Sequence, residues 1–322
     1  MLLSRRCAVQ GNVIPIPLVR THDQRDDGIM KKCLLLMIFG ALLIARGAVA
    51  DDAPIGAAAQ DLPIFDAHMH YKEPAWGPYP PGTVIEMMDK SGVAMALVSS
   101  TPDAGTITLY EYAPARIVPE VRPYHGGYGS SNWTTFPGMF AYIKDRMDRY
   151  PHVGIGEFHL HGIDNADRGL LSEIAKLAKA RGALLHIHSG AEPVLFMYSL
   201  DPDLTILWAH AGMSEPPDVI TPMMDKHPHL YADLSYREWE ILKGAGGTLD
   251  PAWRALLEKH PDRFMVGTDT WVNEQWSRYD ELIAMNRKWL AQFPRALAEG
   301  FAYGNAEKVF GRKITSDLLG TR

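Results

Sequence analysis

Histidines and carboxylates recur in this chain at a two-residue spacing that suits a metal centre. His68 and His70 close an apolar segment, residues 63–70, that ends in Phe-Asp-Ala-His-Met-His. Alternate side chains of a β-strand share a face, so Asp66, His68 and His70 are expected to point the same way. Two imidazoles at a strand end can bind one metal ion through nitrogens about 2.0–2.1 Å from it.

The same pattern returns at later apolar segments. Seven of the 13 histidines stand at the ends of such segments, which is more than scattered structural histidines would give. These seven are His68 and His70 together with His159, His161, His186, His188 and His210, and the carboxylates Glu157 and Asp269 stand at the same segment ends. A strand end that carries Asp or Glu beside His can supply both metal ligands and a proton acceptor.

Eight short apolar segments alternate with helical patterns, and this order predicts the elements that position these residues. The expected strands are 63–70, 94–100, 116–122, 154–160, 183–189, 205–210, 230–235 and 264–269. The clearest helices are 140–150, 168–181, 217–227, 251–260, 279–292 and 305–310. The count predicts an α/β fold, a (β/α)8 TIM barrel, whose strand ends form one ring. An open doubly wound sheet usually has a Gly-rich phosphate loop after its first strand, and this chain has none there.

The first fifty residues are predicted to lie outside the barrel. A basic start at Met30, an apolar stretch at 33–45 and small residues at 48–50 predict a signal peptide over residues 30–50. Residues 1–29 are then an upstream extension from a misassigned start codon. The other expected parts are a mobile lead-in at 51–60, the barrel at 61–312 and a C-terminal tail at 313–322. The protein is expected to be periplasmic or secreted, with no stable membrane anchor after cleavage.

The net charge and the cysteine content restrict which binding partners and which metal ligands are expected. Residues 1–50 hold seven Lys or Arg and three Asp or Glu, so cleavage changes the formal net charge from −6 to −10. That balance disfavours nucleic acid as a partner and leaves a small-molecule substrate, with a homo-oligomer still open. Both cysteines, Cys7 and Cys33, fall in the leader, so His and carboxylate must bind any metal. One or two divalent ions are expected, zinc first, with manganese, iron or cobalt as alternatives.

Taken together, these motifs resemble the amidohydrolase superfamily over roughly residues 61–312, in particular the amidohydrolase-related branch that includes aminocarboxymuconate semialdehyde decarboxylase-like enzymes. The resemblance rests on Asp-Ala-His-Met-His at 66–70, His-Ser-Gly at 188–190, Ala-His-Ala-Gly at 209–212 and Gly-Thr-Asp at 267–269. It implies a barrel of the metal-dependent hydrolase type, with metal ligands at His68, His70, His188 and Asp269.

The resemblance leaves some roles open. It makes His210 either a ligand of a second metal or a general acid/base. Glu157 resembles a fourth-strand Glu of TatD-like hydrolases that helps to bind a second metal. The fourth strand has no Lys, so a carbamylated bridging lysine is excluded there. His188 is preferred to His186 as the fifth-strand ligand because it lies nearer the C-terminal end of the strand.

Two catalytic functions fit this set of residues. The first is a hydrolase in which metal-activated water attacks an amide, ester or lactone and Asp269 takes its proton. The second is a metal-dependent, non-oxidative decarboxylase of an aromatic or unsaturated acid, with His210 as proton donor and Arg237 on the substrate carboxylate. A non-catalytic periplasmic binding protein on the same barrel is a third reading, which the intact ligand set disfavours.

Substrate contacts are predicted at four further residues. Arg237 is expected either to bind a substrate carboxylate or to pair with Glu238 or Glu240, and Tyr236 beside it is a further candidate. His159 and His161 either line the pocket or are hydrogen-bonded strand histidines.

Overall fold

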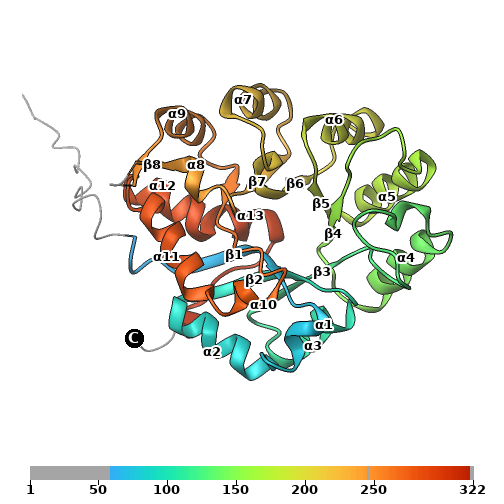
Figure 1. The fold of residues 1–322 in the computed structure, drawn as a ribbon, viewed down its shortest axis with the longest axis horizontal. Coiled ribbons are helices and arrows are strands. Elements are labelled where there is room, and N and C mark those ends of the chain that lie inside the picture. Colours follow the sequence, from blue (N-terminus) through green and yellow to red (C-terminus); the bar gives the residue numbers. More distant parts are fainter. Residues whose placement is uncertain (1–58, 245–246, 320–322) are drawn as a thin grey trace, which may run out of the picture. The chain divides into compact units, whose positions relative to one another are not determined.

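Eight parallel strands form the centre of the molecule and helices surround them (Figure 1). The computed structural model describes residues 59–244 and 247–319, so the predicted upstream extension, the signal peptide and most of the lead-in lie outside the described residues. The strands are β1 Ile64–His70, β2 Val93–Ser99, β3 Ile117–Val121, β4 Gly154–His159, β5 Leu184–His188, β6 Ile206–Trp208, β7 Leu230–Asp233 and β10 Phe264–Met265. Their order in the sheet is β1-β2-β3-β4-β5-β6-β7-β10.

The sheet closes on itself between its first and last strands. Ala67 N donates to Val266 O at 2.9 Å, and Asp269 N donates to His68 O at 2.6 Å. These bonds continue the β10 pairing beyond its two assigned residues. The predicted (β/α)8 TIM barrel is therefore confirmed.

The helices follow from amphipathic segments with local start and stop signals. They are α1 Glu73–Trp76, α2 Pro81–Ser91, α3 Ala104–Tyr112, α4 Met139–Arg149, α5 Arg168–Arg181, α6 Ala191–Leu200, α7 Pro217–Lys226, α8 Glu238–Ile241, α9 Pro251–Lys259, α10 Asn273–Trp276, α11 Tyr279–Leu290, α12 Arg295–Glu299 and α13 Asn305–Phe310. A small antiparallel hairpin, β8 Leu242–Lys243 with β9 Thr248–Leu249, follows α8. Asp167 caps α5 by accepting from Leu170 N, and Gly182 ends that helix in the left-handed conformation that glycine adopts without strain.

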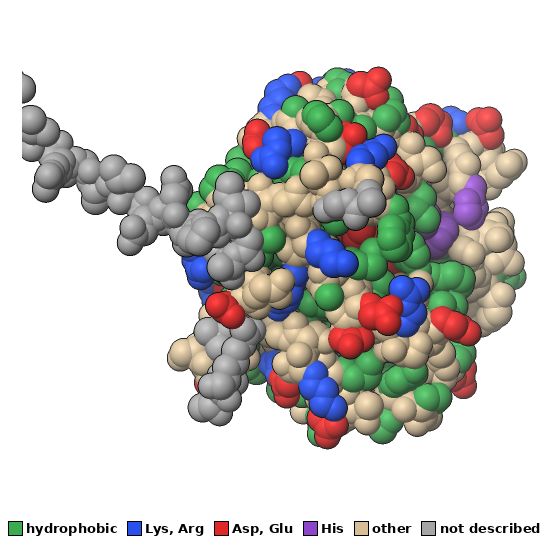
Figure 2. Space-filling model, turned by 60° about the vertical axis from the view of Figure 1, so that its left-hand side comes forward, with side chains coloured by type: hydrophobic (Ala, Val, Ile, Leu, Met, Phe, Trp, Pro, Cys, Tyr) green, Lys and Arg blue, Asp and Glu red, His purple; other side chains and the backbone are tan. Residues whose placement is uncertain are grey.

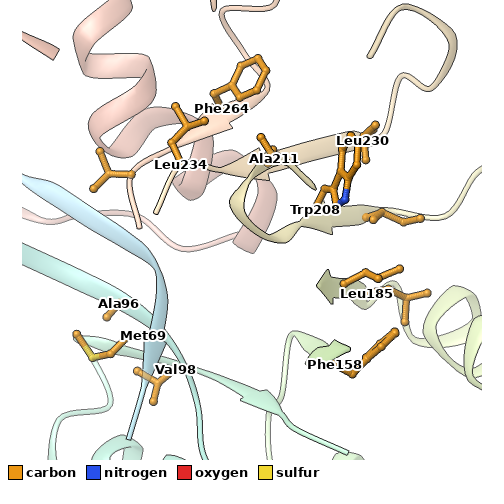
Figure 3. Close-up of a cluster of buried hydrophobic side chains, with 14 of the residues drawn as sticks. Met69, Ala96, Val98, Phe158, Leu185, Trp208, Ala211, Leu230, Leu234 and Phe264 are labelled. Atoms are coloured by element: carbon orange, nitrogen blue, oxygen red, sulfur yellow. The ribbon is translucent and has the colours of Figure 1, made fainter. Parts of the chain in front are cut away.

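Alternating side chains of the strands divide the core into two parts. Phe158, Leu185, Trp208 and Phe264 belong to the larger cluster, which fills the space between strands and helices (Figure 3). A second cluster, which includes Leu97, Val118, Leu184, Leu207 and Met265, takes alternate positions on the same strands. Polar residues replace apolar ones at the C-terminal ends of the strands, as the TIM barrel architecture requires of its active-site end.

The first strand departs from strict alternation. Its register with β2 shifts between Asp66 and Met69. The Asp66 carboxylate accepts from Thr268 Oγ1 at 2.6 Å and from the Tyr279 hydroxyl on α11 at 3.1 Å. The prediction that Asp66 shares a face with His68 and His70 is therefore wrong, because the irregularity breaks the two-residue period between them.

The surface mixes side chains of both charges. On the face drawn in Figure 2, acidic and basic side chains lie interspersed with apolar ones. Among residues 59–244 and 247–319, no helix has both the length and the apolar character needed to span a membrane.

Candidate active site

The two first-strand histidines lie with their Nε2 atoms close together. His68 Nε2 and His70 Nε2 are 3.1 Å apart, and they lie 3.6 Å and 3.2 Å from Asp269 Oδ1. Their other nitrogens are held from behind, because His68 Nδ1 lies 3.2 Å from Asp233 Oδ2 and His70 Nδ1 lies 3.0 Å from Ser99 Oγ. Such contacts fix the orientation of the rings and leave Nε2 to face a ligand.

The carboxylate of Glu157 lies between two groups of histidines. Its Oε2 is 3.1 Å from His70 Nε2, while its Oε1 is 2.7 Å from His188 Nδ1 and 3.6 Å from His210 Nε2. Arg122 donates to Oε2 at 2.8 Å and to the main-chain oxygen of Glu157 at 3.0 Å. One buried carboxylate is thus shared between a side chain of β1, the last side chain of β5 and a side chain that follows β6.

The backbone takes an unfavourable conformation where it presents His210 and Asp269. Both residues are left-handed, with φ of 55° and 48°, a region that residues other than glycine rarely occupy. The surroundings hold the turn in place, since Asp233 Oδ2 accepts from His210 N at 3.1 Å and Ser235 Oγ lies 2.9 Å from His210 Nδ1. Strain of this kind occurs mainly where a side chain has to be aimed at a functional site.

The cluster concentrates negative charge in a buried place. Burial is the largest single effect and disfavours the charged form of Glu157, but the neighbouring histidines, His68 foremost, together outweigh it and lower the pKa of Glu157 well below its ordinary value. The pKa of Asp269 falls to about 2 against the same opposing effect of burial. Burial also opposes a charged His68, yet nearby carboxylates, Asp233 foremost, outweigh it and raise the pKa of His68. The site therefore attracts positive charge.

The donor atoms fit a divalent cation. Among the described residues, His210 Nε2 and Asp269 Oδ1 are buried without a hydrogen-bond partner, although buried polar atoms are normally satisfied. Ligand atoms of His68, His70 and Glu157 lie within 4.8 Å of one another, as do those of His68, His210 and Asp269. Imidazole and carboxylate without thiolate is a ligand set of zinc and similar ions.

A cavity of about 530 Å³ opens beside the cluster, large enough for a small organic molecule. Glu157, His188 and Asp269 form the part of its lining that belongs to the cluster. Much of the remaining wall is cationic or aromatic, and it includes Lys72, Arg122, Tyr124, His159, Met213, Tyr236 and Trp271.

Comparison with known proteins identifies the family. The sequence pattern of the family described as Amidohydrolase matches residues 65–312, which is most of the chain. The chain belongs to the amidohydrolase family. It is accordingly an enzyme of the metal-dependent hydrolase type that acts on a small molecule, and its buried His, Glu and Asp clusters suggest a divalent metal. The amidohydrolase-related branch stays a prediction.

Several solved structures share the fold of this amidohydrolase. YjjV, a TatD homolog from Escherichia coli K12, is 15% identical with a TM-score of 0.55, over 78% of this chain and 98% of that one. L-hydantoinase (dihydropyrimidinase) from Arthrobacter aurescens is 12% identical with a TM-score of 0.52, over 78% and 71%. A probable 2-pyrone-4,6-dicarboxylic acid hydrolase from Acinetobacter baumannii is 13% identical with a TM-score of 0.50, over 77% and 99%. No curated protein matched the chain.

The structure separates the two fifth-strand histidines of the amidohydrolase. His188 lines the cavity and contacts Glu157. His186 lies deeper, with Nδ1 3.1 Å from Glu120 Oε2 and Nε2 3.6 Å from Asp233 Oδ2. This placement agrees with the preference for His188 as the ligand and gives His186 a supporting position.

Three of the four predicted substrate contacts lie at cavities. Tyr236 and His159 line the large one, where the His159 ring stacks on His188 with centroids 4.0 Å apart and its Nδ1 lies 2.8 Å from the Tyr124 hydroxyl. Burial lowers the pKa of His159 to about 3, so this imidazole is neutral at ordinary pH. His161 lies outside the large cavity and lines a neighbouring polar pocket.

Arg237 does not contact the large cavity, which corrects the prediction that it binds a substrate carboxylate. Its guanidinium is fully buried and donates to the carbonyls of His210 at 3.1 Å and Glu215 at 2.7 Å, and to the Glu240 carboxylate at 2.8 Å. It also lies over the Trp253 ring. Arg237 therefore holds the left-handed turn that carries His210, and the alternative pairing with Glu240 is the one observed.

Sequence reasoning missed three residues of the site. Arg122 and Lys72 line the cavity, and Asp233 supports His68 and His210 from behind. Arg122 ends a predicted strand, Lys72 follows one by two residues and Asp233 lies near the end of a third, so their position near strand ends was a usable signal. A lone Arg, Lys or Asp carries no motif of its own, whereas the paired histidines do.

Proposed function

We propose that this amidohydrolase hydrolyses a C–N or C–O bond, in an amide, ester or lactone, at a centre that binds two divalent ions, zinc foremost. The observation that carries the proposal is the position of Glu157. Its two carboxylate oxygens face different histidines, His70 at 3.1 Å and His188 at 2.7 Å. A carboxylate so placed could be a ligand of both cations, and a pair of cations would stabilise the attacking and the leaving oxygen in hydrolysis.

The ligands divide into two sets around that carboxylate. His68, His70 and Asp269 would hold one ion, and His188 and His210 would hold the other, with Glu157 shared. The unpartnered atoms His210 Nε2 and Asp269 Oδ1 belong to different sets, so each set has one buried atom that a cation would satisfy. The cation supplies Lewis acidity, which polarises the substrate carbonyl and lowers the pKa of water.

The protein's own residues manage the proton and the charge that develops on the carbonyl oxygen. Asp269 is ionised at neutral pH because its pKa is about 2, and it borders the cavity, so it is placed to take a proton from water and pass it to the leaving group. The Tyr236 hydroxyl already accepts from Trp271 Nε1 at 2.8 Å and Gln275 Nε2 at 2.6 Å. Its own hydrogen is therefore left to donate into the cavity, toward an oxygen that becomes negative.

Metal analysis combined with an activity screen tests the proposal. The purified protein should contain close to two zinc ions per chain, and the metal-loaded enzyme should hydrolyse members of a panel of amides, esters and lactones. The variant Asp269→Asn should fold normally and lose turnover by at least about a hundredfold, since it removes the proton acceptor. Retained activity in that variant, or no bound metal in active wild-type protein, would refute the mechanism.

The decarboxylase alternative is distinguished by its product. It predicted that Arg237 holds the substrate carboxylate, and that guanidinium is engaged in the protein interior. Release of carbon dioxide from aromatic acids, in the absence of any hydrolytic activity, would favour it. Export through a signal peptide at residues 30–50 is part of the proposal, and N-terminal sequencing of the protein from its native host tests it.

A further inference from the structure

Three buried polar residues of the barrel interior take no part in the chemistry proposed above. Glu120 lies on β3, His186 on β5 and Asp233 on β7, and each is at most 1% exposed. Together with His68 of β1 they come from alternate strands, as the side chains of one interior layer of a TIM barrel do. Bulky apolar residues usually fill such layers, so a polar layer at this place needs a reason.

The strands themselves show where the interior changes from apolar to polar. Val118 precedes Glu120 by two residues on β3, and Leu184 precedes His186 by two residues on β5. Both apolar side chains belong to the second hydrophobic cluster. Residues two apart on a strand share a face, so the polar layer directly follows the apolar interior in the direction of the metal-binding cluster.

A chain of close contacts connects this layer to the cluster. His186 Nδ1 lies 3.1 Å from Glu120 Oε2, and His186 Nε2 lies 3.6 Å from Asp233 Oδ2, within ion-pair distance. The same Asp233 oxygen lies 3.2 Å from His68 Nδ1. The His186 ring therefore stands between two carboxylates, with one nitrogen facing each of them.

The Asp233 carboxylate contacts a residue of each proposed ligand set. Its Oδ2 faces the His68 ring and accepts from His210 N at 3.1 Å, while its Oδ1 accepts from Ser235 N at 3.0 Å. His68 belongs to the set around one ion and His210 to the set around the other. A shift of this single carboxylate would therefore displace ligands of both ions.

Two glycines leave room for the carboxylates of the layer. A Cβ at Gly154 on β4 would lie 2.9 Å from Glu120 Oε1, and a Cβ at Gly267 would lie 2.8 Å from Asp233 Oδ1. Carbon and oxygen atoms that are not bonded do not approach so closely, so any larger residue at either position would displace a carboxylate. The backbone is thus shaped to accommodate these acidic side chains.

Stability alone does not account for the layer. Within the described part of the chain, Glu120 Oε1 is buried without a hydrogen-bond partner, which costs free energy. Replacement of buried ion pairs by apolar side chains of similar volume is often neutral or stabilising. In contrast, the partners behind a metal-binding histidine fix its ring, and their loss typically weakens metal binding by about 10–100-fold.

We propose that His186 is a positioning residue, which Glu120 orients and which holds the Asp233 carboxylate against both His68 and the backbone of His210. The inference rests on the proposed function in taking His68 and His210 as ligands of neighbouring ions. It adds a role for a buried histidine and a buried glutamate that line none of the cavities described above. The layer would set the position of one ligand set relative to the other.

Two double variants separate positioning from a purely structural role. Glu120→Leu/His186→Leu and Glu120→Gln/His186→Gln both remove the two ionisable groups, but only the glutamine pair keeps an amide that can donate to Asp233. In the presence of a chelator both should melt within a few degrees of wild type. The leucine pair should bind zinc about 10–100-fold more weakly and change the visible spectrum of the cobalt-loaded protein, whereas the glutamine pair should restore both to near wild type.

His152→Leu is a matched control, because it removes another buried imidazole that lies 3.1 Å from a carboxylate, that of Asp103. It stands between α4 and β4, and the variant should leave zinc affinity and the cobalt spectrum unchanged. Should the leucine pair fail to fold, Glu120→Gln/His186→Phe keeps the ring shape without its nitrogens and replaces it in the comparison.

The zinc affinities and cobalt spectra can overturn the assignment in two ways. Wild-type zinc affinity in the leucine pair, or in the phenylalanine variant that replaces it, would show that His186 does not position the ligands. An equal loss of affinity in the glutamine pair would show that donation to Asp233 is not the cause. Absence of hydrolysis, with zinc binding still dependent on the layer, would instead refute the proposed function alone.

Discussion

Replacing Glu157 with glutamine removes one negative charge from the middle of the proposed metal centre while keeping the shape of the side chain. The carboxylate is 3% exposed and the Arg122 side chain that donates to it is 6% exposed. Both are desolvated, so loss of the carboxylate leaves the guanidinium of Arg122 buried without its counter-charge. The variant also weakens the contacts to His70 at 3.1 Å and His188 at 2.7 Å.

The expected loss of stability follows from that burial. Removing one partner of a buried ion pair costs about 3–5 kcal/mol, because the remaining charge has no compensation. For a domain of this size each kcal/mol corresponds to about 2–4 °C in Tm, so metal-free Glu157→Gln should melt roughly 6–20 °C below the metal-free wild type. The metal-loaded variant should show a still larger deficit, since a neutral amide bridges cations poorly.

Thermal melts with and without a chelator, together with bound metal measured per chain, check both effects. Glu238→Gln is a matched control, because Glu238 is also buried and accepts from Asn286 at 3.4 Å, with no cation within ion-pair distance among the described residues. That variant should not melt lower than wild type at pH 8. Unchanged Tm and unchanged metal content in Glu157→Gln would refute the central place assigned to this carboxylate.

Two further predictions concern Tyr236 and the pH dependence of stability. Tyr236→Phe should lower kcat by roughly a hundredfold with little effect on Tm, because it removes a donor to the developing negative charge; steady-state kinetics and a melt on the same preparation check it. Burial raises the pKa of Glu238 from its ordinary 4.5 to about 7. As pH rises from 4.5 to 7, the unfolded chain releases this proton before the folded chain does. The free energy of unfolding should therefore fall by up to about 3 kcal/mol over this range. Denaturant unfolding of Glu238→Gln across this range should show a correspondingly smaller fall, and an identical profile in both proteins would contradict the assignment.

Most residues of the candidate site could be predicted from the sequence because they occur in local patterns. His68 with His70, Glu157 with His159, and His186 with His188 are pairs whose two-residue spacing is visible without any structure. The alternation of apolar segments and helical patterns was sufficient to predict the barrel. The barrel in turn predicted that the strand ends lie in one ring. The expected helix at 168–181 coincides with α5, since capping by Asp167 and the glycine at 182 are local signals.

Interactions between distant segments decided what local patterns could not. Asp66 looked equivalent to His68 by period two, but its partners Thr268 and Tyr279 lie about two hundred residues along the chain and take its carboxylate out of the cluster. Arg237 was predicted either to bind a substrate carboxylate or to pair with Glu238 or Glu240, and carbonyls that follow β6 surround its guanidinium while Glu240 accepts from it. The Arg237–Glu240 pair is local, but the carbonyls around Arg237 and the Thr268 and Tyr279 hydroxyls come from other parts of the chain.

The sequence by itself determined the fold class and the candidate metal-binding side chains, and it excluded cysteine from those candidates. Residue types and their periodicity depend only on the chain. Tertiary structure decided which candidates share a centre, that Glu157 lies between His70 and His188, and that Arg237 is buried away from the cavity. The physical reason is that distances between side chains on different strands are set by barrel closure and packing, which no single segment specifies.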